Sequence, residues 1–229
     1  MWLAAILVTL AIILVHILGE KFSKHIEKFH RELLSLGAGL MVGIFFLKIL
    51  PHITLGEQFL GQFVYVFLLI GFILIHILEK YVYQHARSKR EVAKDIILFE
   101  KAGLAAHGFF IGFFIAVYFE AFEQLAYLIV APFFIRTFAI SVSSAHISEK
   151  NESRLYTILK NTPFMIGTLS GLILSSSKVW LFIALSIATG FIVYIIIRDM
   201  IPPQKEGRPI YFVVGALVIL FITLLNHMG

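Results

Sequence analysis

One histidine, His107, stands in the middle of the apolar stretch GLAAHGFFIGFFIAV, which runs from Gly103 to Val117. Burying an imidazole in hydrocarbon costs free energy unless another group pairs with it, so an ionisable residue at this depth is a candidate functional site. The other interpretation is a neutral histidine that donates one hydrogen bond to a neighbouring helix. The groups that surround His107 must decide between the two.

A second unusual pair, Pro132 and Arg136, lies in the apolar stretch from Gln124 to Ala145. A proline inside a helix lacks the N–H that would bond the carbonyl four residues earlier, here that of Leu128. In lipid that carbonyl needs another donor. Arg136 follows Pro132 by one turn on the same helix face and carries five N–H donors. A structural interpretation is therefore that the arginine satisfies backbone oxygens.

Long apolar segments must carry these residues. The chain has 229 residues, of which 59% are hydrophobic, and most charges fall in short clusters between apolar runs. A bilayer core about 30 Å thick needs about 20 apolar residues per helix. The runs lack the alternation of a membrane barrel, so the predicted fold class is all-α, in one transmembrane domain over residues 1–229. The eight predicted membrane helices are 2–18, 33–50, 60–78, 96–119, 124–145, 157–175, 179–197 and 210–226.

The positions of lysine and arginine predict the orientation. Basic residues accumulate in short cytoplasmic loops. The loops after the first, third, fifth and seventh predicted helices are rich in lysine and arginine. Lys178 is the only lysine or arginine in the other loops. Both termini are therefore expected outside the cytoplasm. The net charge of +5 reports this topology and needs no nucleic-acid partner to explain it.

Three stretches resemble a known family. SLGAGLMVGIFFLKILPHI (Ser35–Ile53), GFILIHILEKYVYQH (Gly71–His85) and ATGFIVYIIIRDMIPP (Ala188–Pro203) look like the second, third and seventh helices of the ZIP family of zinc and iron transporters. The order and spacing of these stretches, the eight helices, the external termini and the long basic third loop agree with that family. The resemblance covers nearly the whole chain.

The resemblance implies a metal site between the fourth and fifth helices. In the family, the fourth helix carries a histidine, an acidic residue four positions on and then a glycine, and the fifth carries a polar ligand and a glutamate four positions later. Residues four apart lie on one helix face, so two such pairs converge on one cation. Zinc takes imidazole and carboxylate ligands of this kind. Zinc or another divalent metal is thus the cargo that the resemblance implies.

Three of the four ligand positions are changed in this chain. His107 matches the family histidine, but Ile111 stands at the acidic position, and Pro132 and Arg136 stand at the positions of the fifth helix. His107 is therefore expected to be a vestigial ligand. A fixed cation about 4 Å from a metal ion changes an attraction of about 4 kcal/mol into a repulsion at an effective dielectric near 20. Arg136 either plugs the vacated site, together with Pro132, or forms an anion or substrate site.

Other polar residues are candidates for a pathway. Glu100 shares a face with His107 near the cytoplasmic end of the fourth predicted helix, where pairing with a nearby lysine is the other interpretation. Lys48 stands where the family often has a histidine, and Lys48 and His52 lie near the outer end of the second helix. A lysine at such a place can extend to water. His16 is expected at the inner interface.

Two functions from different classes follow. One is a ZIP-like transport protein in which ordinary zinc transport is doubtful. The other is a ZIP-derived membrane protein that does not transport and has a structural, regulatory or binding role. No phosphate-binding loop, nucleophile elbow or zinc-protease motif occurs, so an enzyme is not predicted. The chain has no cysteine, so neither a disulfide framework nor a thiolate metal site is predicted. The expected partners are the lipid bilayer, a divalent metal by resemblance and, as a candidate, a second copy of the chain.

Overall fold

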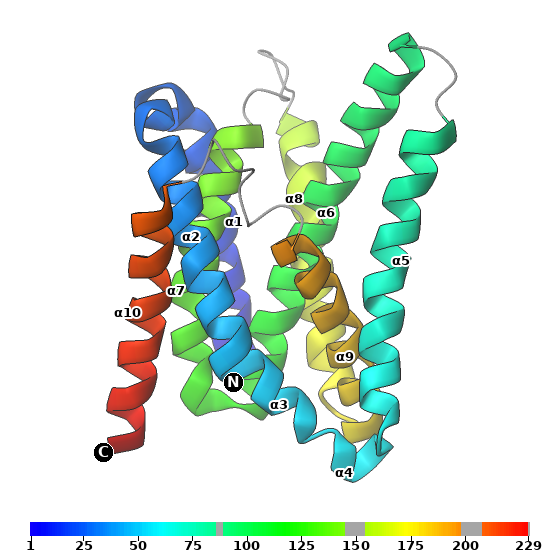
Figure 1. The fold of residues 1–229 in the computed structure, drawn as a ribbon, viewed down its shortest axis with the longest axis vertical. Helices are drawn as coiled ribbons and strands as arrows, with labels where there is room; N and C mark the ends of the chain where they lie inside the picture. Colours follow the sequence, from blue (N-terminus) through cyan, green and yellow to red (C-terminus); the bar gives the residue numbers. More distant parts are fainter. Residues whose placement is uncertain (86–88, 145–153, 198–207, 229) are drawn as a thin grey trace.

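The computed structural model describes residues 1–85, 89–144, 154–197 and 208–228, which are helical almost throughout and contain no strand. The all-α class is confirmed for this part of the chain. Figure 1 shows a bundle of long helices with both ends of the chain at the same end of the bundle. The helices are α1 (Trp2–Ile26), η1 (Glu27–Phe29), α2 (His30–Ile44), η2 (Phe45–Ile49), α3 (Leu50–Thr54), α4 (Glu57–Leu60), α5 (Phe63–His85), α6 (Lys89–Ala121), α7 (Glu123–Ser144), α8 (Arg154–Leu174), α9 (Lys178–Ile195) and α10 (Pro209–Met228).

Several helices are apolar enough for a membrane. Within the described residues, three helical stretches are long and apolar enough to cross one, namely Trp2–Leu60, Gly103–Ala121 and Lys178–Ile195. Shorter apolar helices cover Phe63–Ile77, Ala126–Val142 and Pro209–Leu225. The first stretch is not straight, because the chain reverses direction at η1 between α1 and α2 (Figure 1). These helices are compatible with a membrane protein.

Some helices differ from the predicted segments at their ends. α1 continues to Ile26 and α6 already begins at Lys89, both through charged sequence. Lysine and glutamate are good helix formers, so a helix can continue beyond the apolar part that identified it. The sequence also did not predict η2, a π-helical turn over Phe45–Ile49 just before Pro51.

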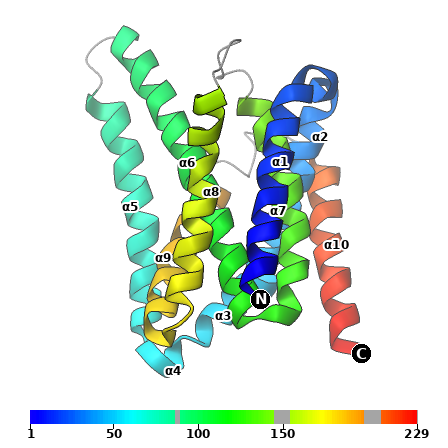
Figure 2. The ribbon, with the colours of Figure 1, turned by 180° about the vertical axis from the view of Figure 1, so that it is seen from behind.

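The helices form pairs in a mirrored pattern. The most extensive contacts join α6 with α8, α2 with α10, α5 with α9, and α1 with α7. Exchanging α1, α2 and α5 for α8, α9 and α10, and α6 for α7, maps this set of pairs onto itself. The helices so exchanged run in opposite directions, as the colours in Figures 1 and 2 show. The bundle thus has the pairing pattern of an inverted repeat.

Glycines bring three of these pairs into close contact. A Cβ atom on Gly39 would lie 2.0 Å from the carbonyl oxygen of Phe212 in α10, and one on Gly71 would lie 2.1 Å from that of Ile187 in α9. A Cβ atom on Gly112 of α6 would lie 2.0 Å from the carbonyl oxygen of Phe164 in α8. Small residues allow helix backbones to approach in this way, which is the usual mode of association in membranes.

The central helix of the bundle is α6. Its residues from Ile111 to Phe119 are all buried. The first helix is joined to α8 by polar contacts, because the hydroxyls of Thr9 and Thr168 lie 2.8 Å apart and Lys160 Nζ lies 2.7 Å from a carboxylate oxygen of Glu20. These contacts join α1 to α8.

Candidate functional site

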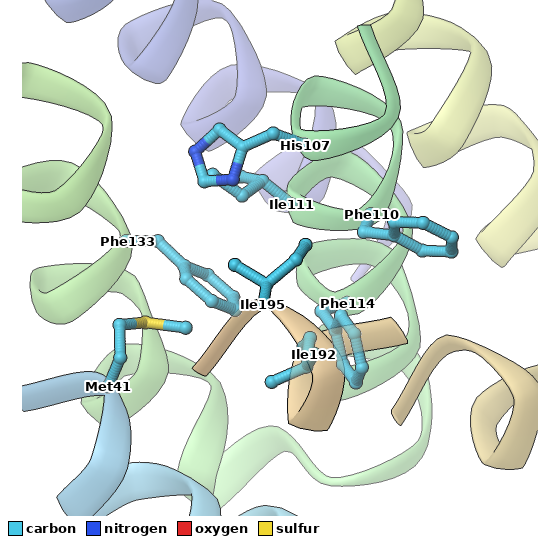
Figure 3. Close-up of a pocket in the computed structure, with 8 residues that line it drawn as sticks. All are labelled: Met41, His107, Phe110, Ile111, Phe114, Phe133, Ile192 and Ile195. Atoms are coloured by element: carbon cyan, nitrogen blue, oxygen red, sulfur yellow. The ribbon is translucent and has the colours of Figure 1, made fainter. Parts of the chain in front are cut away.

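A small cavity lies at the crossing of α2, α6, α7 and α9. Its volume is about 20 Å³, which is enough for about one water molecule. Figure 3 shows the imidazole of His107 at its edge and apolar side chains around it. The lining residues are Met41, His107, Phe110, Ile111, Phe114, Phe133, Ile192 and Ile195.

Among the described residues that line this cavity, His107 alone has a polar side chain. Its Nε2 atom is buried and has no hydrogen-bond partner among the described residues. Ile111, one turn further along α6, is 3% exposed and also faces the cavity (Figure 3). A buried isoleucine therefore stands where the resemblance implies an acidic ligand, and it supplies no atom that binds a metal.

Arg136 lies close to His107 from the neighbouring helix. It is 5% exposed, and its guanidinium is within electrostatic range of the His107 imidazole. Its backbone packs against α2 at Gly37, because a Cβ atom on Gly37 would lie 3.6 Å from the Cα atom of Arg136. The arginine is thus enclosed between α2 and α7 and places a permanent positive charge near the histidine.

His16 lies near His107, and its predicted position was wrong. It was expected at the interface, but it is 5% exposed, lies within electrostatic range of His107 and packs its ring 5.8 Å from that of Phe164. The reason is the length of α1, which continues ten residues past His16 to Ile26 and so places His16 inside the bundle. The signal that was available is the polar but helix-forming sequence GEKFSKHI after the apolar run.

Pro132 is buried within α7, and the helix continues through it to Ser144. The next residue, Phe133, supplies part of the cavity wall. Where the resemblance implies a polar ligand, the chain therefore has a residue with no side-chain donor or acceptor. The bond from Arg136 to the Leu128 carbonyl stays a prediction.

These residues do not fit a divalent metal. Zinc needs about four nitrogen, oxygen or sulfur ligands, whereas the region around His107 offers imidazoles, a guanidinium and apolar side chains. In the described part of the chain, no three histidine, cysteine, aspartate or glutamate residues are grouped so that they could hold a metal ion. Glu100 lies in α6, but its side chain is outside the described residues.

A second polar cluster lies nearer the end of the bundle that carries the termini. Lys48 is 6% exposed as a whole residue, but its Nζ atom is not among the buried atoms that lack a partner, so its extension to water stays a prediction. Lys48 belongs to the π-helical turn η2, and such a turn holds more residues than an α-turn and so changes which of them face the core. The His52 Nδ1 atom donates a hydrogen bond to the Lys48 carbonyl, and the His52 ring lies 5.7 Å from that of Tyr118.

Comparisons with known proteins identify no relative. No protein family, no curated protein and no solved structure gives a significant match to the chain. The function must therefore be argued from the residues and their arrangement.

Replacing Arg136 is expected to destabilise the protein. Arg136→Ala removes the partner of buried groups and should lower the free energy of unfolding by about 1–3 kcal/mol. Arg136→Lys should restore only part of this loss, because an ammonium lacks the planar fork of donors. Thermal unfolding in detergent measures both. The matched control is Arg208→Ala, since Arg208 is 59% exposed in its ion pair with Glu32 and should contribute little. An Arg136→Ala variant as stable as the control would contradict the plug interpretation.

Proposed function

We propose that the chain is a ZIP-like membrane transport protein with eight membrane-spanning helices and both termini outside the cytoplasm. The observation that carries the proposal is the mirrored pairing of antiparallel helices around a central α6 and α7, which bring His107 and Arg136 together. Many secondary transporters are built from inverted repeats, with the substrate site at the interface of the two halves near the middle of the membrane. The motifs that resemble the ZIP family add to this support.

Zinc is not the cargo that the residues of this core favour. Ile111, Pro132 and Arg136 replace the ligands that zinc would need, and Arg136 opposes an approaching cation. We therefore propose a transport protein that does not carry divalent metal through the site at His107.

One observation favours the second candidate, a ZIP-derived protein that does not transport. The cavity beside His107 is small, and the other described side chains that line it, from four helices, are apolar. A core filled in this way is suited to a structural, regulatory or binding role.

Flux measurements separate the two functions. The purified protein is reconstituted in liposomes, and uptake of Zn²⁺, Fe²⁺ and Mn²⁺ is compared with uptake of monovalent salts and with empty liposomes. The proposal about cargo expects no uptake of divalent metal above that of empty liposomes, and the proposed transport function expects a flux of another ion. Uptake of zinc that His107→Ala abolishes would overturn the proposal about cargo, and the absence of any flux would favour the second candidate.

The proposed topology gives a further expected result. A reporter fused after Met228 should be accessible from outside the cell, because the carboxyl terminus is proposed to be external. A cysteine introduced at Ser88, in the basic loop after the third span, should resist an impermeant thiol reagent. The chain has no cysteine of its own, so any label reports the introduced residue. Labelling of Ser88→Cys in intact cells would reverse the orientation.

A further inference from the structure

The turn that joins α1 to α2 carries a group of exposed basic side chains. Its exposed cations are Lys21, Lys24, Lys28 and Arg31. Lys21 and Lys24 lie three residues apart in α1 and so share one helix face. The other two follow in η1 and at the start of α2, where the chain reverses direction. Residues 21–31 are called the basic turn below.

The carboxylates at the two ends of the basic turn are engaged by other helices. A carboxylate oxygen of Glu20 lies 2.7 Å from Nζ of Lys160 in α8. A carboxylate oxygen of Glu32 lies 3.4 Å from Nε of Arg208, just before α10. Between these two glutamates, Glu27 is the one carboxylate in the sequence that opposes the cations of the turn. The turn therefore presents an excess of positive charge to its surroundings.

Two large aromatic rings are exposed among these cations. Phe22 is 46% exposed and Phe29 is 55% exposed. The ammonium of Lys21 lies 6.0 Å from the centre of the Phe22 ring, and that of Lys28 lies 4.8 Å from the centre of the Phe29 ring. Phenylalanine beside lysine is typical of segments at a membrane interface, where the ring enters the acyl boundary and the ammonium stays among the headgroups. A partner that offers only acidic groups would account for the cations but not for the exposed rings.

The basic turn lies at the level of the headgroups when α1 and α2 span the membrane as proposed. The apolar run of α1 ends at Leu18, and that of α2 begins at Leu33. At a rise of about 1.5 Å per residue, Lys21 lies about 4.5 Å beyond the first run and Arg31 about 3 Å before the second, within the headgroup region of about 5–7 Å on each side of a bilayer. Figure 1 shows the turn at the end of the bundle away from the termini, which on the proposed topology is the cytoplasmic end. The cytoplasmic leaflet is the one that carries a negative surface potential from anionic lipids.

We propose that the basic turn binds the headgroups of anionic phospholipids in the cytoplasmic leaflet. The ammonium groups and the guanidinium of the turn pair with phosphate oxygens, and its two exposed phenylalanine rings enter the boundary with the acyl chains. Anionic headgroups are preferred to zwitterionic ones because the turn has an excess of positive charge. The inference rests on the proposed membrane placement of α1 and α2, and it does not depend on transport.

Thermal unfolding of the purified protein in a neutral detergent tests this surface, with phosphatidylglycerol and phosphatidylcholine as the probes. A lipid that binds only the native state raises its stability by mass action. The expected result is a melting temperature that rises to saturation with phosphatidylglycerol and rises less with phosphatidylcholine. The difference between the two lipids should shrink at high salt, because salt screens exposed charges.

Variants assign the difference to the basic turn. Lys24→Gln should raise the apparent dissociation constant for phosphatidylglycerol about fivefold, the contribution of one lysine at an anionic surface. Lys21→Gln, Lys24→Gln and Lys28→Gln together should remove most of the difference between the two lipids. The same three residues changed to arginine should retain the difference, because arginine keeps the charge. Lys178→Gln is the matched control, because Lys178 is exposed at the start of α9, outside the turn, and it should leave the difference almost unchanged.

The outcomes separate this inference from the proposed function. Equal stabilisation by the two lipids, or a difference that the triple lysine-to-glutamine variant retains, would overturn the basic turn as a lipid site. An equal rise with glycerol phosphate would show that the turn takes a free anion, and would overturn it too. Release of the protein from membranes by alkaline carbonate would overturn the membrane placement and this inference with it. A lipid preference that depends on the turn, combined with no ion flux in liposomes, would support the site and contradict transport.

Discussion

Zinc is expected to bind and stabilise a variant that carries Ile111→Glu, Pro132→His and Arg136→Glu together, while leaving the unmodified protein almost unaffected. The three changes would restore the ligand types that the ZIP resemblance implies around His107 and would shift the charge of the site by three units toward negative. Ile111 already faces the same cavity as His107, so a glutamate there is placed to share a ligand with it. At a free zinc concentration of 100 times the dissociation constant, the stabilisation should be about 2.7 kcal/mol.

The partial combinations are the controls for this result. With Arg136 retained, Ile111→Glu and Pro132→His should recover little zinc binding, because the guanidinium still opposes the metal. The stability of each variant is measured with and without zinc. The cost of burying the new carboxylates is the same in both measurements and cancels in the difference. Tight zinc binding by the unmodified protein that survives His107→Ala would place any metal site elsewhere in the chain.

Gly112→Ala is expected to destabilise the protein strongly. A Cβ atom at this position would lie 2.0 Å from the carbonyl oxygen of Phe164 and 2.8 Å from the hydroxyl oxygen of Thr168, so α6 and α8 would have to move apart. Inserting a methyl group into such a contact costs about 1–3 kcal/mol or more. Thermal unfolding in detergent measures the loss.

Gly103→Ala is the matched control on the same helix. A Cβ atom at Gly103 would meet no other atom within 4 Å, and alanine is the better helix former by about 1 kcal/mol. This variant should therefore be as stable as the unmodified protein or slightly more stable. Equal stability of the two variants would show that the close contact of α6 with α8 does not hold in the folded protein.

The helices could be predicted because their signal is local. Most residues of each predicted segment are helical in the structure, but Gly61 and Gln62 form a turn inside the predicted segment 60–78, and Ser175 lies just beyond the end of α8. Apolar runs of the length of a bilayer need no knowledge of their neighbours. The π-helical turn at Phe45–Ile49 and the pairing of α2 with α10 could not be predicted, because they depend on contacts between residues far apart in the chain.

The sequence predicted those residues of the candidate site that are polar and stand within apolar segments. His107 and Arg136 stand out in apolar sequence, and the structure brings them near one another. His16 also stands out, but distance from the end of an apolar run is a poor measure of burial, and His16 is more buried than expected. The apolar wall of the cavity is formed by residues of four helices, so it could not be predicted from any single segment of the sequence.

The pairing of α2 with α10 has a consequence for how the protein is made. Gly39 and Gly43 on α2 pack against Phe212 and Ile219 of α10, so the surface around these glycines has no native partner until the ribosome has synthesised α10. Chains emerge from the amino terminus first. α2 therefore lacks this partner while α5 to α9 are synthesised, and a chain truncated before Pro209 would leave this surface of α2 open to other helices.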